Sequence, residues 1–220
     1  MAPDTWSRHR IVSRLAAEPQ TLLDVGGVAG ELALFMPRTR IVTANVEEGA
    51  DVIFDGITLP FDDRSFETAA SLDVLEHVPR DQRGVHLNDL TRVAESRVIL
   101  CCPLGSDAHE AAERELADWH ESVTGRRHRF LDEHLQCGLP REKELRALTS
   151  AASMPFELRF HGDFEEANEL FRLSTLAKHR KRPADIARYA RVRVGRRREG
   201  PLTERPGRRA NRAFLVGRRG

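Results

Sequence analysis

The chain has 220 residues, of which 40% are hydrophobic and 31% charged, and its formal net charge at pH 7 is +1. This length accommodates one domain with a large buried core, and no run of about 18 apolar residues offers a membrane span. Arginines interrupt the apolar residues near the N-terminus, and the three cysteines form no Cys-x-x-Cys pair. We therefore expect no signal peptide, reduced thiols and a cytoplasmic location.

Charge is unevenly distributed along the chain. Residues 181–220 contain 14 Lys and Arg but only 3 Asp and Glu, so the remainder is acidic. An arginine-rich end of this kind indicates either an anionic partner or pairing with the chain's own carboxylates.

Strand-like and helix-like segments alternate along the chain. Apolar runs predict strands at 21–25, 40–46, 51–54, 67–72, 97–103, 156–161 and 211–217. Helical spacing and helix-ending residues predict helices at 4–17, 31–35, 80–95, 106–123, 128–135, 141–153, 165–178 and 183–194. This alternation predicts an α/β fold with a doubly wound, mostly parallel sheet.

One connection is too short for this pattern. Only residues 47–50 separate the strands 40–46 and 51–54, whereas a parallel crossover normally needs a dozen or more residues. We expect the helix between these strands to be missing, or the strand 51–54 to be short and irregular.

The segment Leu22-Leu23-Asp24-Val25-Gly26-Gly27-Val28-Ala29-Gly30-Glu31-Leu32 carries the clearest functional signal. It is typical of a buried strand followed by a glycine turn and the start of a helix. Glycines let a ligand approach the main chain, and a helix start offers free N–H groups. Asp24 suits a hydroxyl or ammonium group, and the glycine spacing differs from that of dinucleotide-binding turns. A nucleoside site without a pyrophosphate is therefore predicted.

Further motifs follow this turn in a fixed order. They are Asp55-Gly56-Ile57-Thr58-Leu59-Pro60-Phe61, Ser65-Phe66-Glu67 and Ser71-Leu72-Asp73-Val74-Leu75-Glu76-His77-Val78-Pro79. With the glycine turn, they resemble the class I S-adenosylmethionine-dependent methyltransferases, in the branch that carries LPF and LEHV motifs. The resemblance covers about residues 21–103. It implies a Rossmann-like, seven-stranded sheet with an antiparallel last strand, S-adenosyl-L-methionine as the cofactor, and methyltransferase activity.

The resemblance also implies which residues bind the cofactor. They are Asp24, Gly26, Gly27, Gly30, Asn45, Val46, Asp55, Gly56, Ile57, Leu72 and Asp73. Asp24 and the glycines would hold the methionine end and the edge of the ribose. Asp55 would contact the adenine amino group, although an Asp at this position also forms a local turn.

Two positions depart from the family's pattern. Val28 stands where the commonest glycine motif has a glycine, and Asn45 stands where an acidic residue usually takes both ribose hydroxyls. An amide lacks the charge that strengthens such hydrogen bonds. Either Asn45 binds one hydroxyl, or Glu47 reaches the ribose, or Glu47 is simply solvated.

Asp73 and His77 are the candidate catalytic residues. Asp73 would hold the methionine ammonium or a substrate proton. His77 has a side chain that titrates near neutrality and could act as a general base, although Glu76 and His77 could also only cap and orient a helix. Methyl transfer needs mainly alignment, so a dedicated base is not required. No His-x-x-x-His pair or carboxylate triad has metal-ligand spacing, so no metal is predicted.

Two insertions extend the family's pattern. Residues 104–140 form a lid over the carboxyl end of the strand 97–103, with a capping box at Asp107 and Glu110 and a helix end at Gly125. An acceptor site could be lined by Trp119, His120, His128, Phe130 and His134. The basic insertion 163–210 should emerge on the same side, and we assign Arg196, Arg197 and Arg198 to binding an anion.

One methyltransferase domain is predicted over 1–220, comprising an N-terminal helix (1–20), a cofactor-binding half (21–103), the lid (104–140) and a C-terminal half (141–220). The predicted reaction is methyl transfer to an O or N atom of a small molecule, sugar or natural product, and the basic insertion favours an anionic acceptor. An RNA methyltransferase that grips phosphates with its arginines is one alternative. A degenerate, non-catalytic interaction module is the other, because Val28, Asn45 and the missing helix weaken the cofactor site. Oligomeric state is not predicted.

Overall fold

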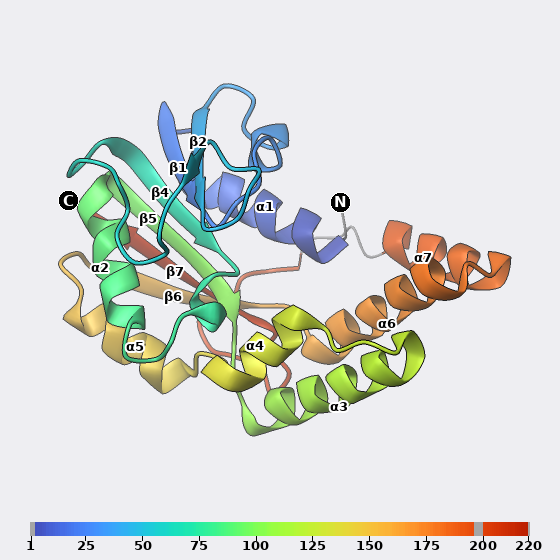
Figure 1. The fold of residues 1–220 in the computed structure, drawn as a ribbon. Helices are drawn as coiled ribbons and strands as arrows, with labels where there is room; N and C mark the ends of the chain where they lie inside the picture. Colours follow the sequence, from blue (N-terminus) through green and yellow to red (C-terminus); the bar gives the residue numbers. More distant parts are fainter. Residues whose placement is uncertain (1–2, 196–199, 220) are drawn as a thin grey trace.

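The computed structural model describes residues 3–195 and 200–219 (Figure 1). In these residues the sheet contains strands β1 (Thr21–Val25), β2 (Arg40–Asn45), β3 (Val52–Ile53), β4 (Phe66–Leu72), β5 (Ala94–Pro103), β6 (Phe156–His161) and β7 (Arg212–Arg218). The helices are α1 (Pro3–Ala16), α2 (Arg83–Val93), α3 (Asp107–Thr124), α4 (Arg129–Cys137), α5 (Glu142–Ala151), α6 (Phe164–Arg180), α7 (Pro183–Gly195) and the 3₁₀ helices η1 (Leu32–Leu34) and η2 (Leu75–His77). The predicted bounds agree within three residues, with the corrections given below.

The strands follow the order β3-β2-β1-β4-β5-β7-β6. Pairing is parallel from β3 to β5, whereas β7 lies antiparallel between β5 and β6. The predicted mostly parallel, seven-stranded sheet with an antiparallel last strand is confirmed. Because every strand except β7 points the same way, the carboxyl ends lie along one edge, and ligands of open α/β sheets bind at such an edge.

Helices cover both faces of the sheet. On one face, Leu22 of β1 packs with Ile11 of α1. On the other face, Leu23 of the same strand packs in a cluster with Leu90 of α2 and Leu145 of α5. Burial on both faces explains why the strands are nearly continuous apolar runs, and it confirms the doubly wound arrangement.

The short helix predicted at 31–35 is a single 3₁₀ turn rather than an α-helix. The chain makes only the 3₁₀ turn η1, in which Phe35 N donates to Leu32 O (3.0 Å) and Met36 N donates to Ala33 O (3.3 Å). Pro37 follows at once and β2 begins at Arg40, which leaves no room for an α-helix. The glycine turn is therefore followed by a 3₁₀ turn and not by an α-helix.

The short connection between β2 and β3 is confirmed. Here β2 runs directly into a turn, and β3 has two residues. The Asp51 carboxylate closes this turn by accepting hydrogen bonds from the backbone N and the Oγ1 of Thr43, both at 2.8 Å. Gly49 O accepts a hydrogen bond from Ala29 N at 3.2 Å. The connection thus supports the glycine turn in place of a helix.

The lid consists of α3 and α4 (Figure 1). Its cap differs from the predicted box, because the Ser106 hydroxyl accepts a hydrogen bond from His109 N at 3.1 Å. Asp107 and Glu110 instead form ion pairs with Arg141, at 2.7 and 2.9 Å. The predicted end of α3 at Gly125 is confirmed, with φ +72°. Helix α4 contacts η2, and α3 contacts α6, so the lid spans the carboxyl edge.

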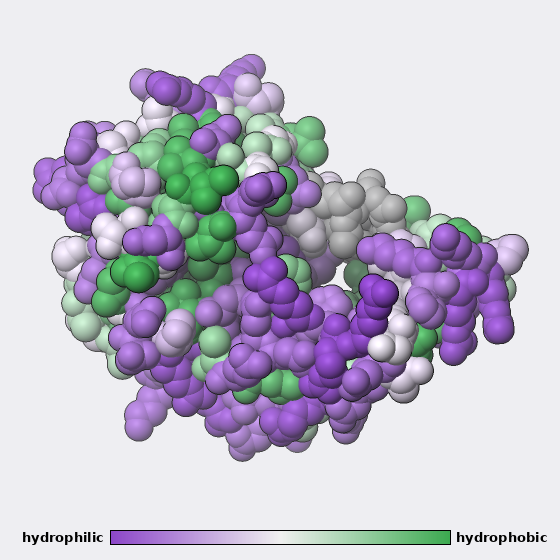
Figure 2. Space-filling model, in the orientation of Figure 1, coloured by the Kyte–Doolittle hydropathy of each residue, from purple (hydrophilic) through white to green (hydrophobic). Residues whose placement is uncertain are grey.

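The basic insertion begins at this same edge, because β6 is parallel to β5 and α6 follows it. Helices α6 and α7 pack together and project away from the sheet (Figure 1). Figure 2 shows this helical side to be mainly hydrophilic, whereas apolar residues gather over the sheet. Thr203 pairs with Phe160 of β6 through two 2.9 Å backbone hydrogen bonds. Arg196, Arg197 and Arg198 lie outside the described residues.

No described helix is both long enough and apolar enough to cross a membrane.

Candidate functional site

The glycine turn after β1 is packed tightly against its neighbours. Gly26 has φ +82°, and a Cβ there would overlap the Val74 side chain just before η2. A Cβ on Gly27 would overlap the carboxylate of Asp24. Only glycine therefore allows both neighbours to approach the turn. Gly30 has φ +86° and open space beside it, so its role is conformational.

Asn45 fastens the glycine turn to the end of β2. Its Nδ2 donates hydrogen bonds to Gly26 O (2.9 Å) and Gly27 O (3.2 Å), and its Oδ1 accepts one from Val46 N (2.7 Å). A carboxylate could not donate the first two, which explains an amide at this position. Glu47 is held by Arg129 of α4 at 2.6 Å. Asn45 and Glu47, the two residues predicted to contact the ribose, therefore both have partners within the protein.

Asp55 forms a local turn, which is one of the two roles that its sequence context allows. Its Oδ1 accepts hydrogen bonds from Ile57 N (2.8 Å) and Thr58 N (3.1 Å), and these N–H groups lower the pKa of the carboxyl. Gly56 takes φ +81° and brings the chain against Val46. Four apolar side chains around this edge are more than half exposed: Val28, Val46, Ile53 and Ile57. They form an apolar surface beside the glycine turn.

Asp24 is buried beneath the turn, with 2% of its surface exposed. Burial, helped by the nearby Glu31 carboxylate, raises its pKa from 3.8 to about 7. The folded protein therefore holds a proton that the unfolded chain releases near pH 4. Stability should fall as pH rises from about 4 to about 7, because ionised Asp24 is disfavoured only in the folded state.

Replacing Asp24 with Asn should remove this dependence. Between about pH 5 and about pH 8, the unfolding free energy of the wild type should fall by about 2 kcal/mol more than that of Asp24→Asn. Urea denaturation at several pH values measures both slopes, with Asp62→Asn at an exposed site as the control that should follow the wild type. Parallel wild-type and Asp24→Asn profiles would show that Asp24 is ionised in the folded protein.

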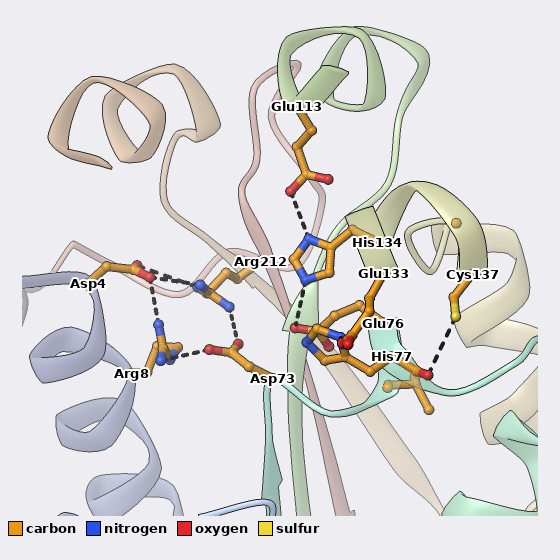
Figure 3. Close-up of polar contacts among 12 residues, drawn as sticks. Asp4, Arg8, Asp73, Glu76, His77, Glu113, Glu133, His134, Cys137 and Arg212 are labelled. Carbon is orange, nitrogen blue, oxygen red and sulfur yellow. Dashed lines mark hydrogen bonds and ion pairs between the residues drawn. The ribbon is translucent and has the colours of Figure 1, made fainter. Parts of the chain in front are cut away.

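Asp73 lies in a cluster of four charges (Figure 3). Arg8 of α1 binds its Oδ2 at 2.7 Å, and Arg212 of β7 binds its Oδ1. Both arginines also bind Asp4, at 2.6 and 2.7 Å. Both carboxylate oxygens of Asp73 are thus bound by guanidinium groups, so neither oxygen is free to hold an ammonium group. Leu72, at the end of β4, is half-buried.

His77 meets the lid directly. Its Nδ1 lies 2.8 Å from Glu133 Oε2, and its ring centroid lies 4.8 Å from that of His134 and 5.5 Å from that of Phe130. Burial and His134 lower the pKa of His77. His77 is therefore a neutral imidazole near pH 7, with a lone pair to offer.

The five predicted lid residues divide into two groups. Phe130 and His134 face η2, whereas His120 and His128 contact Phe171 of α6, with ring centroids 5.8 and 5.1 Å away. Trp119 lies under the guanidinium of Arg172, 5.7 Å from the ring centroid. Only the first group lies at the carboxyl edge of the sheet.

A cavity of about 480 Å³ lies between the lid and the start of α2. Its lining includes Pro79, Arg80, Glu110, Glu113, Arg114 and His134. Glu110 is paired with Arg141, and Glu113 with His134. In the described part of the chain, neither Arg80 nor Arg114 has an ion pair. The uncompensated charge of the cavity is therefore positive.

Arg83 is a residue that the sequence analysis did not single out. Its side chain is fully buried and donates from Nε to Leu75 O and Val78 O, both at 3.1 Å. The guanidinium also pairs with Glu144 at 2.6 Å and donates to Gly138 O. Arg83 thus fixes η2 to the end of the lid. Nothing in its helical sequence context distinguishes it from a surface arginine.

Comparisons with known proteins establish the fold. No protein-family model and no curated protein matches the sequence, but many solved structures are similar to this structure. An S-adenosylmethionine-dependent methyltransferase from Thermotoga maritima is 16% identical, with a TM-score of 0.56, covering 97% of this chain and 91% of its own. Geranyl diphosphate C-methyltransferase from Streptomyces coelicolor, solved with Mg²⁺, geranyl-S-thiolodiphosphate and S-adenosyl-L-homocysteine, is 10% identical, with a TM-score of 0.55, covering 97% and 75%. This chain has the fold of the class I S-adenosylmethionine-dependent methyltransferases.

Proposed function

We propose that this protein binds S-adenosylmethionine at the glycine turn and transfers its methyl group to a small-molecule acceptor. One observation carries this proposal: two features lie together at the carboxyl edge of a methyltransferase fold. The first is the turn over Asp24, where Gly26 and Gly27 leave no room for a Cβ. The second is the exposed apolar surface around Val46 and Ile57. An adenine ring would cover that apolar surface. The residues present therefore fit the cofactor.

Each side chain would have a distinct task. The turn at Gly26 and Gly27 would receive the methionine end, and Asp24, on losing its proton, would offset the ammonium charge. Asp55 would accept a hydrogen bond from the adenine amino group, while the Ile57 N–H holds the Asp55 carboxylate in place. When bound, the cofactor supplies an electrophilic methyl carbon. His77, on the acceptor side, would promote loss of the acceptor's proton.

Asp73 takes a different role in this proposal from the one the motif implies. Its ion pairs with Arg8 and Arg212 join α1 and β7 to the end of β4. We infer that it positions the chain that leads into η2, where Val74 contacts the glycine turn and His77 contacts the lid. It is a positioning residue rather than a catalytic one.

The acceptor should carry an anionic group. The cavity beneath the lid presents the guanidinium groups of Arg80 and Arg114, and guanidinium binds phosphate or carboxylate strongly. Segment 74–79 connects this cavity to the cofactor site, because Val74 touches Gly26 and Pro79 lines the cavity. The geranyl diphosphate methyltransferases act on a phosphate-bearing acceptor in the same fold.

Transfer of labelled methyl groups tests both parts of the proposal. The protein is incubated with methyl-labelled S-adenosylmethionine and matched neutral and phosphorylated sugars and alcohols, with an RNA fragment as a separate arm. We expect labelling of phosphorylated acceptors, reduced about tenfold or more in Arg114→Gln because a charged hydrogen bond is lost. Arg126→Gln, on the exposed end of the lid, should match the wild type. Equal labelling of neutral acceptors, or labelling of RNA alone, would refute an anionic small-molecule acceptor.

A further inference from the structure

Three side chains with metal-binding atoms meet where the lid contacts the sheet (Figure 3). Glu76 and His77 come from η2, and His134 comes from α4. One ligand atom from each lies within 4.8 Å of the other two. No ligand spacing in the sequence marks this group, because its members come together only when the lid packs on η2.

Glu76 is the residue that most needs a partner. Only 1% of its surface is exposed, and neither carboxylate oxygen has a hydrogen-bond partner among the described residues. Burying an unpaired carboxylate is costly, so such groups normally pair with a cation or bind a metal. The nearest basic atom is His134 Nε2, 4.0 Å from Oε1, which is beyond hydrogen-bond distance.

Both imidazoles are oriented for ligation. His134 Nδ1 lies 3.1 Å from Glu113 Oε1, and His77 Nδ1 lies 2.8 Å from Glu133 Oε2. At His134 this carboxylate fixes the ring and keeps the proton on Nδ1, which leaves Nε2 free to bind a metal. At His77 the Glu133 carboxylate lies close to Nδ1 but does not meet hydrogen-bond geometry. Two histidines beside a buried carboxylate provide three protein ligands.

We propose that Glu76, His77 and His134 bind a divalent transition-metal ion. Two imidazoles and one carboxylate suit Zn²⁺, Fe²⁺, Co²⁺ or Mn²⁺ and leave coordination positions open. Ligand atoms around such an ion stand about 3 Å apart, so separations of up to 4.8 Å would have to close by as much as about 2 Å. His134 also lines the cavity, which directs the open positions toward the acceptor.

The ion's role deepens the proposed function and rests on it. An acceptor hydroxyl bound to the ion has a lowered pKa. Its O–H bond breaks and the proton leaves to solvent. The new O–C bond then forms as the bond between the methyl carbon and the sulfonium breaks. His77 would thus promote deprotonation through the ion it binds, and the ion would also hold α4 against η2.

Cobalt binding tests the site without any acceptor. Chelator-treated full-length protein is titrated with Co²⁺, and the visible absorption of the protein-bound ion is recorded. We expect saturable binding that weakens at least about 100-fold in His134→Gln and in Glu76→Gln. His179→Gln, at a surface histidine on α6, should bind as the wild type does. Absence of binding to the wild type, or equal binding by all variants, would overturn the proposal.

Thermal unfolding separates a metal site from a merely structural cluster. Without metal, Glu76→Gln should be at least as stable as the wild type, because it removes an unpaired buried carboxyl. With Co²⁺, the wild type should gain several degrees in Tm and Glu76→Gln should gain none. S-adenosylhomocysteine binding is measured on the same samples. Its persistence without Co²⁺ binding would overturn the metal site alone, and the reverse would overturn the cofactor site alone.

Discussion

Replacing Arg83 with methionine is expected to lower the free energy of unfolding by about 3–5 kcal/mol. The guanidinium is fully buried and is the partner of Glu144 and of the backbone oxygens of Leu75, Val78 and Gly138. Methionine fills similar space but leaves these acceptors unpaired. Urea denaturation measures the loss.

Arg146→Met is the control, because it removes the same charge from an exposed position and so separates loss of the buried contacts from loss of charge. Arg146 of α5 is about half exposed and pairs with Glu142 one helical turn away, at 2.7 Å. Such surface pairs contribute little, so Arg146→Met should change stability by about 0.5 kcal/mol or less. Equal effects at the two positions would mean that Arg83 does not hold η2 to the lid.

Replacing Gly27 with alanine is expected to weaken S-adenosylhomocysteine binding at least about 100-fold, or about 2.7 kcal/mol. The added Cβ would occupy the space of the Asp24 carboxylate, so either the turn or Asp24 must move. Gly27 does not have positive φ, so the effect is steric rather than a backbone strain. Isothermal titration measures the affinity.

Gly207→Ala provides the control for this experiment. Nothing lies within 4 Å of a Cβ at Gly207, and its φ is not positive, so this variant should bind as the wild type does. Circular dichroism of both variants checks that they fold. Unchanged affinity in folded Gly27→Ala would place the cofactor elsewhere, whereas no binding to the wild type would favour the interaction-module alternative.

Local features were the part of the fold that sequence could predict. Continuous apolar runs marked the strands, and Gly125 marked the end of α3, because these signals depend only on neighbouring residues. The four-residue gap before β3 correctly excluded a helix. The short helix predicted at 31–35 and stopped by Pro37 is a 3₁₀ turn, and apolar spacing over so few residues does not distinguish a 3₁₀ turn from an α-helix.

Contacts between distant segments were the part that could not be predicted. Asp73 follows a family motif, yet its partner Arg212 is 139 residues away, and no local pattern links them. Glu76 and His134 meet only because α4 packs on η2. Asn45 looked like a weakened ribose ligand, whereas its amide donates to the glycine turn. In each case tertiary packing, rather than local spacing, determines what the side chain does.

The central claim is that the cofactor binds at the carboxyl ends of β1, β2 and β3. A crystal structure of the protein with S-adenosyl-L-homocysteine tests it most directly. The account predicts the amino-acid end of the ligand at Gly26 and Gly27, and its adenine against Val46 and Ile57 with the N6 amino group at Asp55. Ligand density confined to the cavity beneath the lid, or no ligand density in crystals soaked to saturation, would contradict it.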